Sequence, residues 1–175
     1  MKERILLLTG RPGTGKTAII REVVAKAKVK VGGFYTEEIR TSGIRQGFRI
    51  ITLDGSKAIL AHINISSPFK VSKYKVDVDS LNKVGVSALH RALEESDLIV
   101  IDEIGKMELL SYQFKETVLQ AMNSSKKVLG TIMLSSHPFA DEIKRHPEVK
   151  TLLVTSTNNS QVLKEILSWL NEIGS

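Results

Sequence analysis

The sequence predicts an α/β fold in which a mostly parallel β-sheet has helices on both of its faces. Two observations indicate this class. Short apolar runs alternate along the chain with stretches whose apolar residues recur at i, i+3, i+4 and i+7, the spacing of a helix with one buried face. Strands that alternate with helices in this way pair in parallel, with the helices packed on the faces of the sheet.

Size and composition favour one domain spanning residues 1–175. A chain of 175 residues that is 42% hydrophobic can bury a sizeable core, and its 25% of charged residues is close to the globular average. The absence of cysteine excludes a disulfide scaffold and any cysteine-built zinc or iron–sulfur site. The net charge of +6 is compatible with nucleic acid or with any other phosphate-bearing partner.

The first part of the chain is expected to contain a strand, a glycine-rich turn, a helix and a second strand. Ile5–Leu8 is an apolar run too short for a helix, and a glycine-rich turn follows it. The next helix has an apolar stripe that begins at Ile20 and ends at Ala27. Gly33–Ile39 is predicted to be the next strand.

A β-hairpin is expected to interrupt the alternation of strands and helices. Phe48–Leu53 and Lys57–Ile63 have the composition of strands, and Asp54-Gly55 between them is a strong two-residue turn signal. We therefore expect an antiparallel insertion, over about residues 44–63, into a five-stranded core.

Three further strands and three helices are expected in the rest of the chain. The strands are Leu98–Ile101, Val128–Leu134 and Thr151–Val154. The helices carry buried stripes over Leu81–Ala92, Phe114–Met122 and Leu163–Ile173. Asp77 or Asp79 is expected to cap the first of these helices, and Ser111 the second.

The glycine-rich turn after the first strand matches G-x-x-x-x-G-K-[ST] at every fixed position. Its glycines let backbone N–H groups turn inward around phosphate oxygens, and the following helix adds its positive N-terminal end. We expect Lys16 to neutralise the β- and γ-phosphates of a nucleotide, and Thr17 to place its hydroxyl on Mg²⁺. The predicted nucleotide-binding residues of this loop are Gly10, Arg11, Pro12, Gly13, Thr14, Gly15, Lys16 and Thr17.

An acidic pair, Asp102-Glu103, follows the buried strand Leu98–Ile101, at the sheet edge where ligands bind in open α/β folds. Asp102 is expected to hold Mg²⁺ together with Thr17. Glu103 is well placed to orient and deprotonate a water that attacks the γ-phosphate. Lys16 and Glu103 are thus the predicted catalytic residues, and both acidic residues join the nucleotide site. The alternatives are a helix cap at Asp102 and a surface partner of Lys106 at Glu103.

The segment Asp102–Leu109, with the sequence DEIGKMEL, resembles the small nucleoside-triphosphatase family related to the vertebrate cancer-related nucleoside-triphosphatase. Gly33–Arg40 and Gly47–Ile51 agree with it, and the resemblance runs to about Leu110 and more weakly to the last helix. It implies a P-loop, RecA-like core with strand order 5-1-4-3-2. It also implies slow, Mg²⁺-dependent hydrolysis of nucleoside triphosphates with little base selectivity. Where family members often carry Asn-Arg before the last helix, this sequence has Asn158-Asn159.

Hydrolysis of this kind needs positive charge on the γ-phosphate beyond the loop lysine, from the chain itself or from a partner. The candidate cations are Arg11, Arg40, Lys106 and Arg145. Arginine and lysine side chains are more often solvated surface charges than ligands of a phosphate. Ser135 and Ser136, at the end of the fourth core strand, are either γ-phosphate sensors or ordinary loop serines.

The leading hypothesis is therefore an enzyme that hydrolyses nucleoside triphosphates such as ATP and GTP. A P-loop kinase for a small molecule or nucleoside, and a nucleotide-gated module that binds nucleic acid, are the alternatives. Two small basic clusters lack interleaved aromatic residues apart from Tyr74, which makes nucleic acid the weaker partner; they are Lys26, Lys28 and Lys30, and Lys70, Lys73 and Lys75. The first apolar run is too short for a signal peptide, and no run approaches the ~18 apolar residues of a membrane span. We expect a cytoplasmic monomer without membrane contact.

Overall fold

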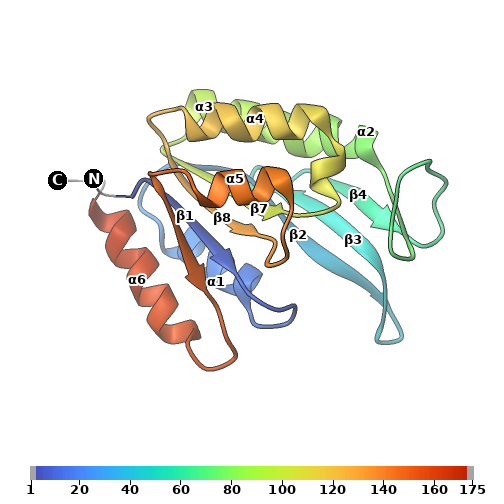
Figure 1. The fold of residues 1–175 in the computed structure, drawn as a ribbon, viewed down its shortest axis with the longest axis horizontal. Helices are drawn as coiled ribbons and strands as arrows, with labels where there is room; N and C mark the ends of the chain where they lie inside the picture. Colours follow the sequence, from blue (N-terminus) through green and yellow to red (C-terminus); the bar gives the residue numbers. More distant parts are fainter. Residues whose placement is uncertain (1–2, 173–175) are drawn as a thin grey trace.

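One continuous β-sheet runs through the part of the chain that the computed structural model describes, residues 3–172 (Figure 1). Its strands are β1 (Ile5–Thr9), β2 (Val31–Thr41), β3 (Ile44–Thr52), β4 (Lys57–His62), β5 (Lys70–Val71), β6 (Tyr74–Val76), β7 (Leu98–Ile104), β8 (Lys127–Ile132) and β9 (Val149–Leu153). Over these residues the nine strands lie in the order β5-β6-β4-β3-β2-β7-β8-β1-β9.

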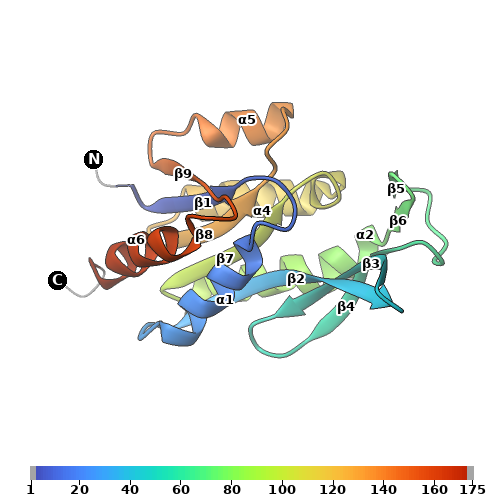
Figure 2. The same cartoon turned by 90° about the horizontal axis from the view of Figure 1, so that it is seen from below.

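Helices cover both faces of the sheet (Figure 1, Figure 2). One face carries α1 (Lys16–Lys26) and α6 (Asn159–Asn171). The other carries α2 (Val78–Ser80), the π-helical turn η1 (Leu81–Val86), α3 (Ser87–Glu95), the 3₁₀ turn η2 (Glu108–Leu110), α4 (Tyr112–Met122) and α5 (Pro138–Lys144). Alternate residues of β1 enter the two cores, Leu6 on the α1 side and Leu7 on the α4 side. Among residues 3–172, no helix has the length and apolar content needed to cross a membrane.

Five strands form the parallel part of the sheet, in the order β9-β1-β8-β7-β2. Numbered among themselves along the chain, they lie in the order 5-1-4-3-2. Helices on both faces bury β1 and most of β7 completely, which is why both strands are unbroken apolar runs in the sequence. Their carboxyl ends meet at one edge, which we call the carboxyl edge. The opposite end of these strands is the amino edge.

The antiparallel hairpin expected over about residues 44–63 is present as β3 and β4, but it is not an insertion beside a five-stranded core, because the sheet of residues 3–172 has nine strands and includes it. Beyond Phe34, β2 leaves β7 and continues in antiparallel pairing with β3, up to the pair Thr41 and Ile44. Ser42 and Gly43, with φ of 51° and 77°, form the tight turn between these strands. Strands β4, β6 and β5 then extend the same sheet, as Figure 2 shows at the side remote from β9. The region around residues 44–63 is therefore a continuation of the sheet.

The helix caps expected from the sequence are confirmed in two places. The Asp77 carboxylate accepts the Ser80 N–H at 2.9 Å, and the Ser111 hydroxyl accepts the Phe114 N–H at 3.0 Å. Helix α5 was not expected. It is only seven residues long and begins at Pro138, after a cap in which the His137 ring accepts the Phe139 N–H. Ile173, which was expected in the last helix, lies outside the described residues.

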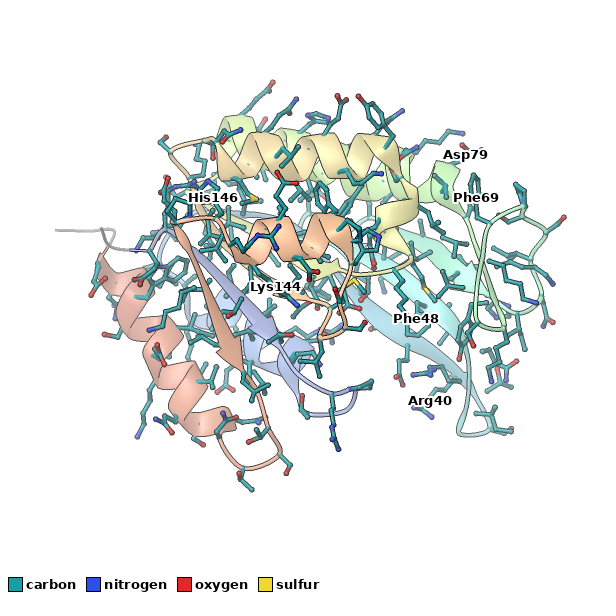
Figure 3. All side chains as sticks on the ribbon, viewed as in Figure 1. Arg40, Phe48, Phe69, Asp79, Lys144 and His146 are labelled. Atoms are coloured by element: carbon teal, nitrogen blue, oxygen red, sulfur yellow. The ribbon has the colours of Figure 1, made fainter. Side chains whose placement is uncertain are left out.

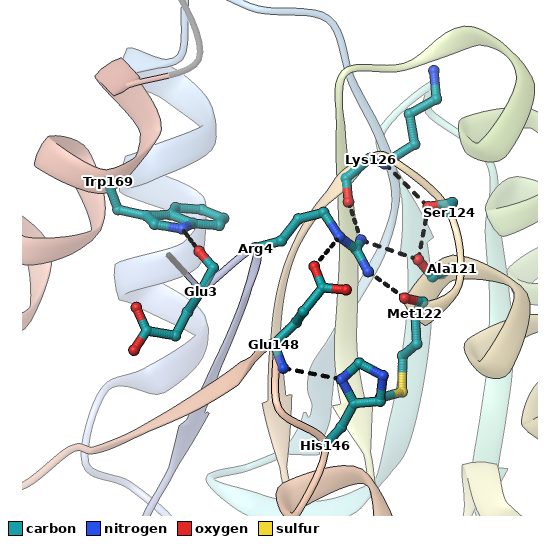
Figure 4. Close-up of polar contacts among 9 residues, drawn as sticks. All are labelled: Glu3, Arg4, Ala121, Met122, Ser124, Lys126, His146, Glu148 and Trp169. Atoms are coloured by element: carbon teal, nitrogen blue, oxygen red, sulfur yellow. Dashed lines mark hydrogen bonds and ion pairs between the residues drawn. The ribbon is translucent and has the colours of Figure 1, made fainter. Parts of the chain in front are cut away.

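Arg4 holds the amino edge together (Figure 4). Its guanidinium donates to the Ala121 carbonyl at 3.3 Å and to the carbonyls of Met122 and Lys126, at and just beyond the end of α4. It also pairs with the Glu148 carboxylate at 2.9 Å, directly before β9. One side chain thus binds three carbonyls at and just beyond the C-terminus of α4 and ties them to Glu148, directly before β9.

Candidate active site

The carboxyl edge brings together the residues predicted to bind phosphate and metal. Strand β1 ends at Thr9 and the loop Gly10–Gly15 leads directly into α1. Strand β7 carries Asp102 and Glu103 at the same edge, separated from β1 in the sheet only by β8. The loop and the β2–β3 hairpin project from this edge (Figure 1). The fold thus places the two sequence motifs, far apart in the chain, side by side.

The predicted phosphate-binding loop, Gly10–Gly15, folds back around the amine of Lys16. The Lys16 Nζ donates to the carbonyls of Gly10 and Arg11, both at 2.8 Å. Helix α1 begins at Lys16 itself, after Gly15 with φ of 97°. A Cβ on Gly15 would lie 2.5 Å from the Asn159 Oδ1, so conformation and space both require glycine there. The amine and the N-terminus of α1 are therefore held at one place, as anion binding requires.

Asp102 is held by two threonine hydroxyls. The Thr17 Oγ1 donates to Asp102 Oδ2 at 2.7 Å, and the Thr131 Oγ1 donates to Asp102 Oδ1 at 2.6 Å. Asp102 is only 2% exposed. Burial raises the pKa of the Asp102 carboxyl above its ordinary value, although both hydroxyls and the charge of Lys16 act to lower it. Because Asp102 lies within β7, it is not a helix cap.

Glu103 is a partly exposed carboxyl with a pKa near neutrality. Burial, followed by the negative charge of Asp102, raises the pKa of Glu103 to about 7, against the lowering effect of Lys16. Its side chain rests on Gly105, where a Cβ would lie 2.8 Å from both Glu103 Cγ and Oε1. Among the ion pairs of residues 3–172 there is none between Glu103 and Lys106, so the surface-pair alternative has no support. A carboxyl with this pKa can act as a general base at neutral pH.

Sequence reasoning missed three polar side chains at this edge. Thr131 holds Asp102; the sequence feature that could have identified it is a polar residue inside the apolar run of β8. Glu108 is 4% exposed, and burial together with the charge of Glu103 raises its pKa well above the ordinary range. The sequence feature that could have identified Glu108 is its position between the apolar residues Met107 and Leu109. The Thr9 Oγ1 has no hydrogen-bond partner, the one such buried side-chain oxygen or nitrogen within residues 3–172.

The structure separates the four candidate cations. Arg11 and Lys106 are exposed on loops at the carboxyl edge. Arg40 is paired with Glu38 at 2.6 Å on the β2–β3 hairpin, where Figure 3 labels it. Arg145 ends α5 next to His146, which Figure 4 shows beside the Arg4 cluster at the amino edge. Arg145 is therefore at the wrong end of the strands to reach a bound phosphate from its own chain.

The two serines after β8 are both exposed. The Ser136 hydroxyl donates to Asp141 Oδ2 at 2.5 Å, which closes the start of α5. No contact of Ser135 or Ser136 with the loop or with Asp102 is found among the hydrogen bonds of residues 3–172.

A family model described as NTPase matches residues 5–167 of the chain. The chain belongs to the NTPase family. The resemblance drawn from the DEIGKMEL segment is thereby confirmed, as is the expectation of a nucleoside-triphosphatase enzyme. Nucleoside-triphosphatase THEP1 of Thermotoga sp. strain RQ2 is 48% identical over 165 residues, which cover 94% of each chain. The protein of the same name from Methanocaldococcus jannaschii is 41% identical, over 93% of this chain and 95% of its own.

Two solved structures of NTPase-family proteins share the fold. The crystal structure of THEP1 from Aquifex aeolicus matches with a TM-score of 0.88 and 37% identity, over 95% of this chain and 98% of its own. The solution structure of a human cancer-related nucleoside triphosphatase matches with a TM-score of 0.81 and 34% identity, over 98% of both chains. The α/β class expected from the sequence is confirmed by these matches and by the mixed sheet.

In this NTPase, Asn158 and Asn159 shape the β9–α6 loop beside the phosphate-binding loop. Asn158 accepts the Thr155 N–H and donates to the Leu153 carbonyl, both at 2.8 Å. Asn159 donates to the Thr155 carbonyl at 2.6 Å and packs against Gly15. The pair therefore fixes a loop and brings no positive charge to the site.

Proposed function

We propose that this protein hydrolyses nucleoside 5′-triphosphates to diphosphates and phosphate in a Mg²⁺-dependent reaction, with Glu103 activating the water. One observation carries the proposal. The Thr17–Asp102 contact of 2.7 Å joins the phosphate-binding loop to the strand that also carries Glu103, a carboxyl whose pKa is raised to about 7. Phosphate ligands, metal ligands and a base are thus presented at one edge.

The loop is suited to a polyphosphate. The amine of Lys16 is held by two carbonyls at 2.8 Å, and the oxygens of a bound β- or γ-phosphate would offer it full negative charge. The N-terminus of α1 points its free N–H groups at the same place. Lys16 thus stabilises the charge on the phosphoryl group that is transferred, and stabilisation of this charge is the main way in which proteins accelerate phosphoryl transfer.

Thr17 and Asp102 fit a Mg²⁺ ion. Both are hard oxygen ligands, and their oxygens already lie 2.7 Å apart. Among residues 3–172 no cluster of three or more His, Asp or Glu side chains could hold a metal, which agrees with an ion shared with the nucleotide. When bound, Mg²⁺ supplies positive charge to the β- and γ-phosphate oxygens. Thr131 keeps Asp102 Oδ1 occupied and so orients Oδ2 toward Thr17.

Glu103 serves as the base that directs the reaction to water. In its ionised form the carboxylate accepts a proton from a water as that water's oxygen attacks the γ-phosphorus. The bond between the γ-phosphorus and the β–γ bridging oxygen breaks, and the electron pair leaves with the diphosphate. The residues that carry the proposal all address the triphosphate or the metal, which supports low base selectivity.

The test is an assay of phosphate release from ATP, GTP, CTP and UTP, with Mg²⁺ or with EDTA and without any added acceptor. We expect phosphate from all four, with kcat/KM within about tenfold across the series, and none with EDTA. Transfer of the phosphoryl group to an added nucleoside in place of phosphate release would show a kinase. A many-fold, salt-sensitive stimulation by RNA or DNA would show a nucleic-acid-gated module instead.

A further inference from the structure

Glu108 is a buried carboxyl that the proposed reaction does not use. It lies at the start of η2, five residues after Glu103, and is 4% exposed. No cation pairs with it among the ion pairs of residues 3–172. A carboxyl without a cation is costly in such a place, so its presence needs a reason.

The contacts of Glu108 are with the loop that carries Glu103. The backbone N–H groups of Gly105 and of Glu108 itself hydrogen-bond to the Glu108 carboxyl. On the other side of the same residue, the Gly105 carbonyl accepts the Leu109 N–H at 3.0 Å. The Gly105 N–H is thus bonded by the Glu108 side chain, and the Gly105 carbonyl is bonded by the Leu109 N–H.

Gly105 in turn is the surface on which the Glu103 side chain lies. Cγ, Cδ and Oε1 of Glu103 all lie within 2.9 Å of the position that a Cβ on Gly105 would occupy. A shift of a few tenths of an ångström in Gly105 therefore moves the Glu103 carboxylate or leaves it loose. Because proton transfer depends on the placement of the base, such a shift is expressed in turnover rather than in nucleotide binding.

We propose that Glu108 is a positioning residue that holds Gly105, and through it aims the Glu103 carboxylate at the attacking water. The proposal rests on the role of Glu103 as the base. In this role Glu108 acts through Gly105 and not on the nucleotide or the attacking water. Its function is to present a hydrogen-bond acceptor at one fixed distance from the loop.

The length of the Glu108 side chain sharpens the proposal. Burial and the nearby charge of Glu103 raise the pKa of Glu108 well above its ordinary value. Glutamine has the same length and the same acceptor oxygen. Aspartate keeps the carboxyl group but is one methylene shorter. A positioning role therefore predicts that Glu108→Gln is the mild change and Glu108→Asp the harmful one.

The experiment measures kcat, KM for ATP and the melting temperature of Glu108→Gln, Glu108→Asp and Glu108→Met, the last of which fills the site but has no acceptor oxygen. We expect Glu108→Gln to stay within about twofold of the wild type. Glu108→Asp and Glu108→Met should each lower kcat about tenfold, the value of one hydrogen bond, with KM unchanged. Glu116→Asp is the matched control, because Glu116 is exposed on α4 and its one hydrogen-bond partner within residues 3–172 is the Tyr112 hydroxyl, at 2.8 Å.

A Glu108→Gln variant as slow as Glu108→Asp would overturn the proposal, because the carboxyl itself would then matter. Wild-type kcat in both Glu108→Asp and Glu108→Met, or a rise in KM alone, would overturn it too. Should Glu108→Asp fail to fold, Glu108→Met decides. Glu103→Gln, assayed beside them, separates the two proposals. If it keeps full turnover, the base assignment fails. If it is inactive while Glu108→Met is normal, only the role of Glu108 fails.

Discussion

The two edges of the parallel strands treat buried polar groups in opposite ways. At the amino edge, the Arg4 side chain is 13% exposed, and its guanidinium meets three carbonyls and the Glu148 carboxylate (Figure 4). At the carboxyl edge, burial raises the pKa values of Asp102, Glu103 and Glu108; the charge of Asp102 raises that of Glu103 further, and the charges of Glu103 and Asp102 raise that of Glu108. The same strands thus end in an ion-paired network on one side and, on the other, in three acidic side chains that take part in none of the ion pairs of residues 3–172.

This difference indicates that the polar groups of the amino edge stabilise the fold, whereas those of the carboxyl edge serve the proposed reaction. A paired and hydrogen-bonded charge lowers the free energy of the folded chain only while its partners stay in place. Carboxyls crowded at a ligand-binding edge lower stability, and they acquire their compensation from Lys16 and from the cations that arrive with a ligand. Changes at the carboxyl edge should therefore alter turnover more than stability, and changes at the amino edge should do the reverse.

The largest effect on activity is expected from Lys16→Ala. Its amine is the one positive charge that the loop folds around, and it also lowers the pKa of Glu103. We expect a loss of kcat/KM of roughly 10²–10³, with weakened nucleotide binding and a melting temperature close to the wild type. Steady-state phosphate release and isothermal titration check this. Lys26→Ala, at the other end of α1 in an exposed pair with Glu22, is the control and should change neither.

Gly105→Ala should lower kcat about 10- to 100-fold while leaving the protein folded. The new Cβ would meet the Glu103 side chain at 2.8 Å, and a side chain moves aside more easily than a backbone. Gly85→Ala is the matched change in the core, where the Cβ would meet Leu81 Cδ1 at 3.1 Å and Phe34 Cε1 at 3.3 Å. It should shift the melting temperature and not kcat. The opposite pattern in this pair of variants would contradict the separation of the two roles.

Arg4→Met should lower the free energy of unfolding by about 2–4 kcal/mol, because it removes the ion-pair partner of the partly buried Glu148 and the guanidinium donor to the carbonyls of Met122 and Lys126. Turnover at a temperature where the variant is folded should equal that of the wild type. Urea titration measures the first quantity and phosphate release the second. Arg91→Ala removes an exposed pair with Asp54 and should cost less than about 1 kcal/mol.

The dependence of kcat/KM on pH is the mildest test. Glu103 must be ionised to accept a proton, so activity should fall about tenfold per pH unit below pH 7 and level off above it. Nucleotide affinity, measured over the same range, removes the contribution of phosphate ionisation. A profile that is flat from pH 5.5 to 8 would contradict the raised pKa of Glu103.

The parts of the molecule that the sequence predicts follow local rules. The loop around Lys16 has the spacing that predicts a phosphate-binding turn, and Asp102 follows an apolar run that marks a strand buried on both faces. Asp77 and Ser111 cap their helices through contacts within three residues. Each of these features is decided by neighbours in the chain, so one sequence suffices to find it.

The remainder depends on contacts between distant residues. Beyond Phe34, the pairing of β2 with β7 ends while its pairing with β3, along the other edge of β2, continues to Thr41, and no local pattern marks that change. The position of Arg145 at the amino edge follows from the return of the chain to β9 after α5. Burial of Glu108 is likewise a tertiary property, because a lone carboxylate in a turn is ordinarily exposed.

The central claim, that Glu103 activates the attacking water, is tested most directly by Glu103→Gln. Glutamine keeps the shape of the side chain over Gly105 but cannot accept a proton from water. We predict that Glu103→Gln binds ATP and Mg²⁺ with an affinity within about threefold of the wild type and releases phosphate at least about 100-fold more slowly. Phosphate release at the wild-type rate by a Glu103→Gln protein that still binds ATP would contradict the account.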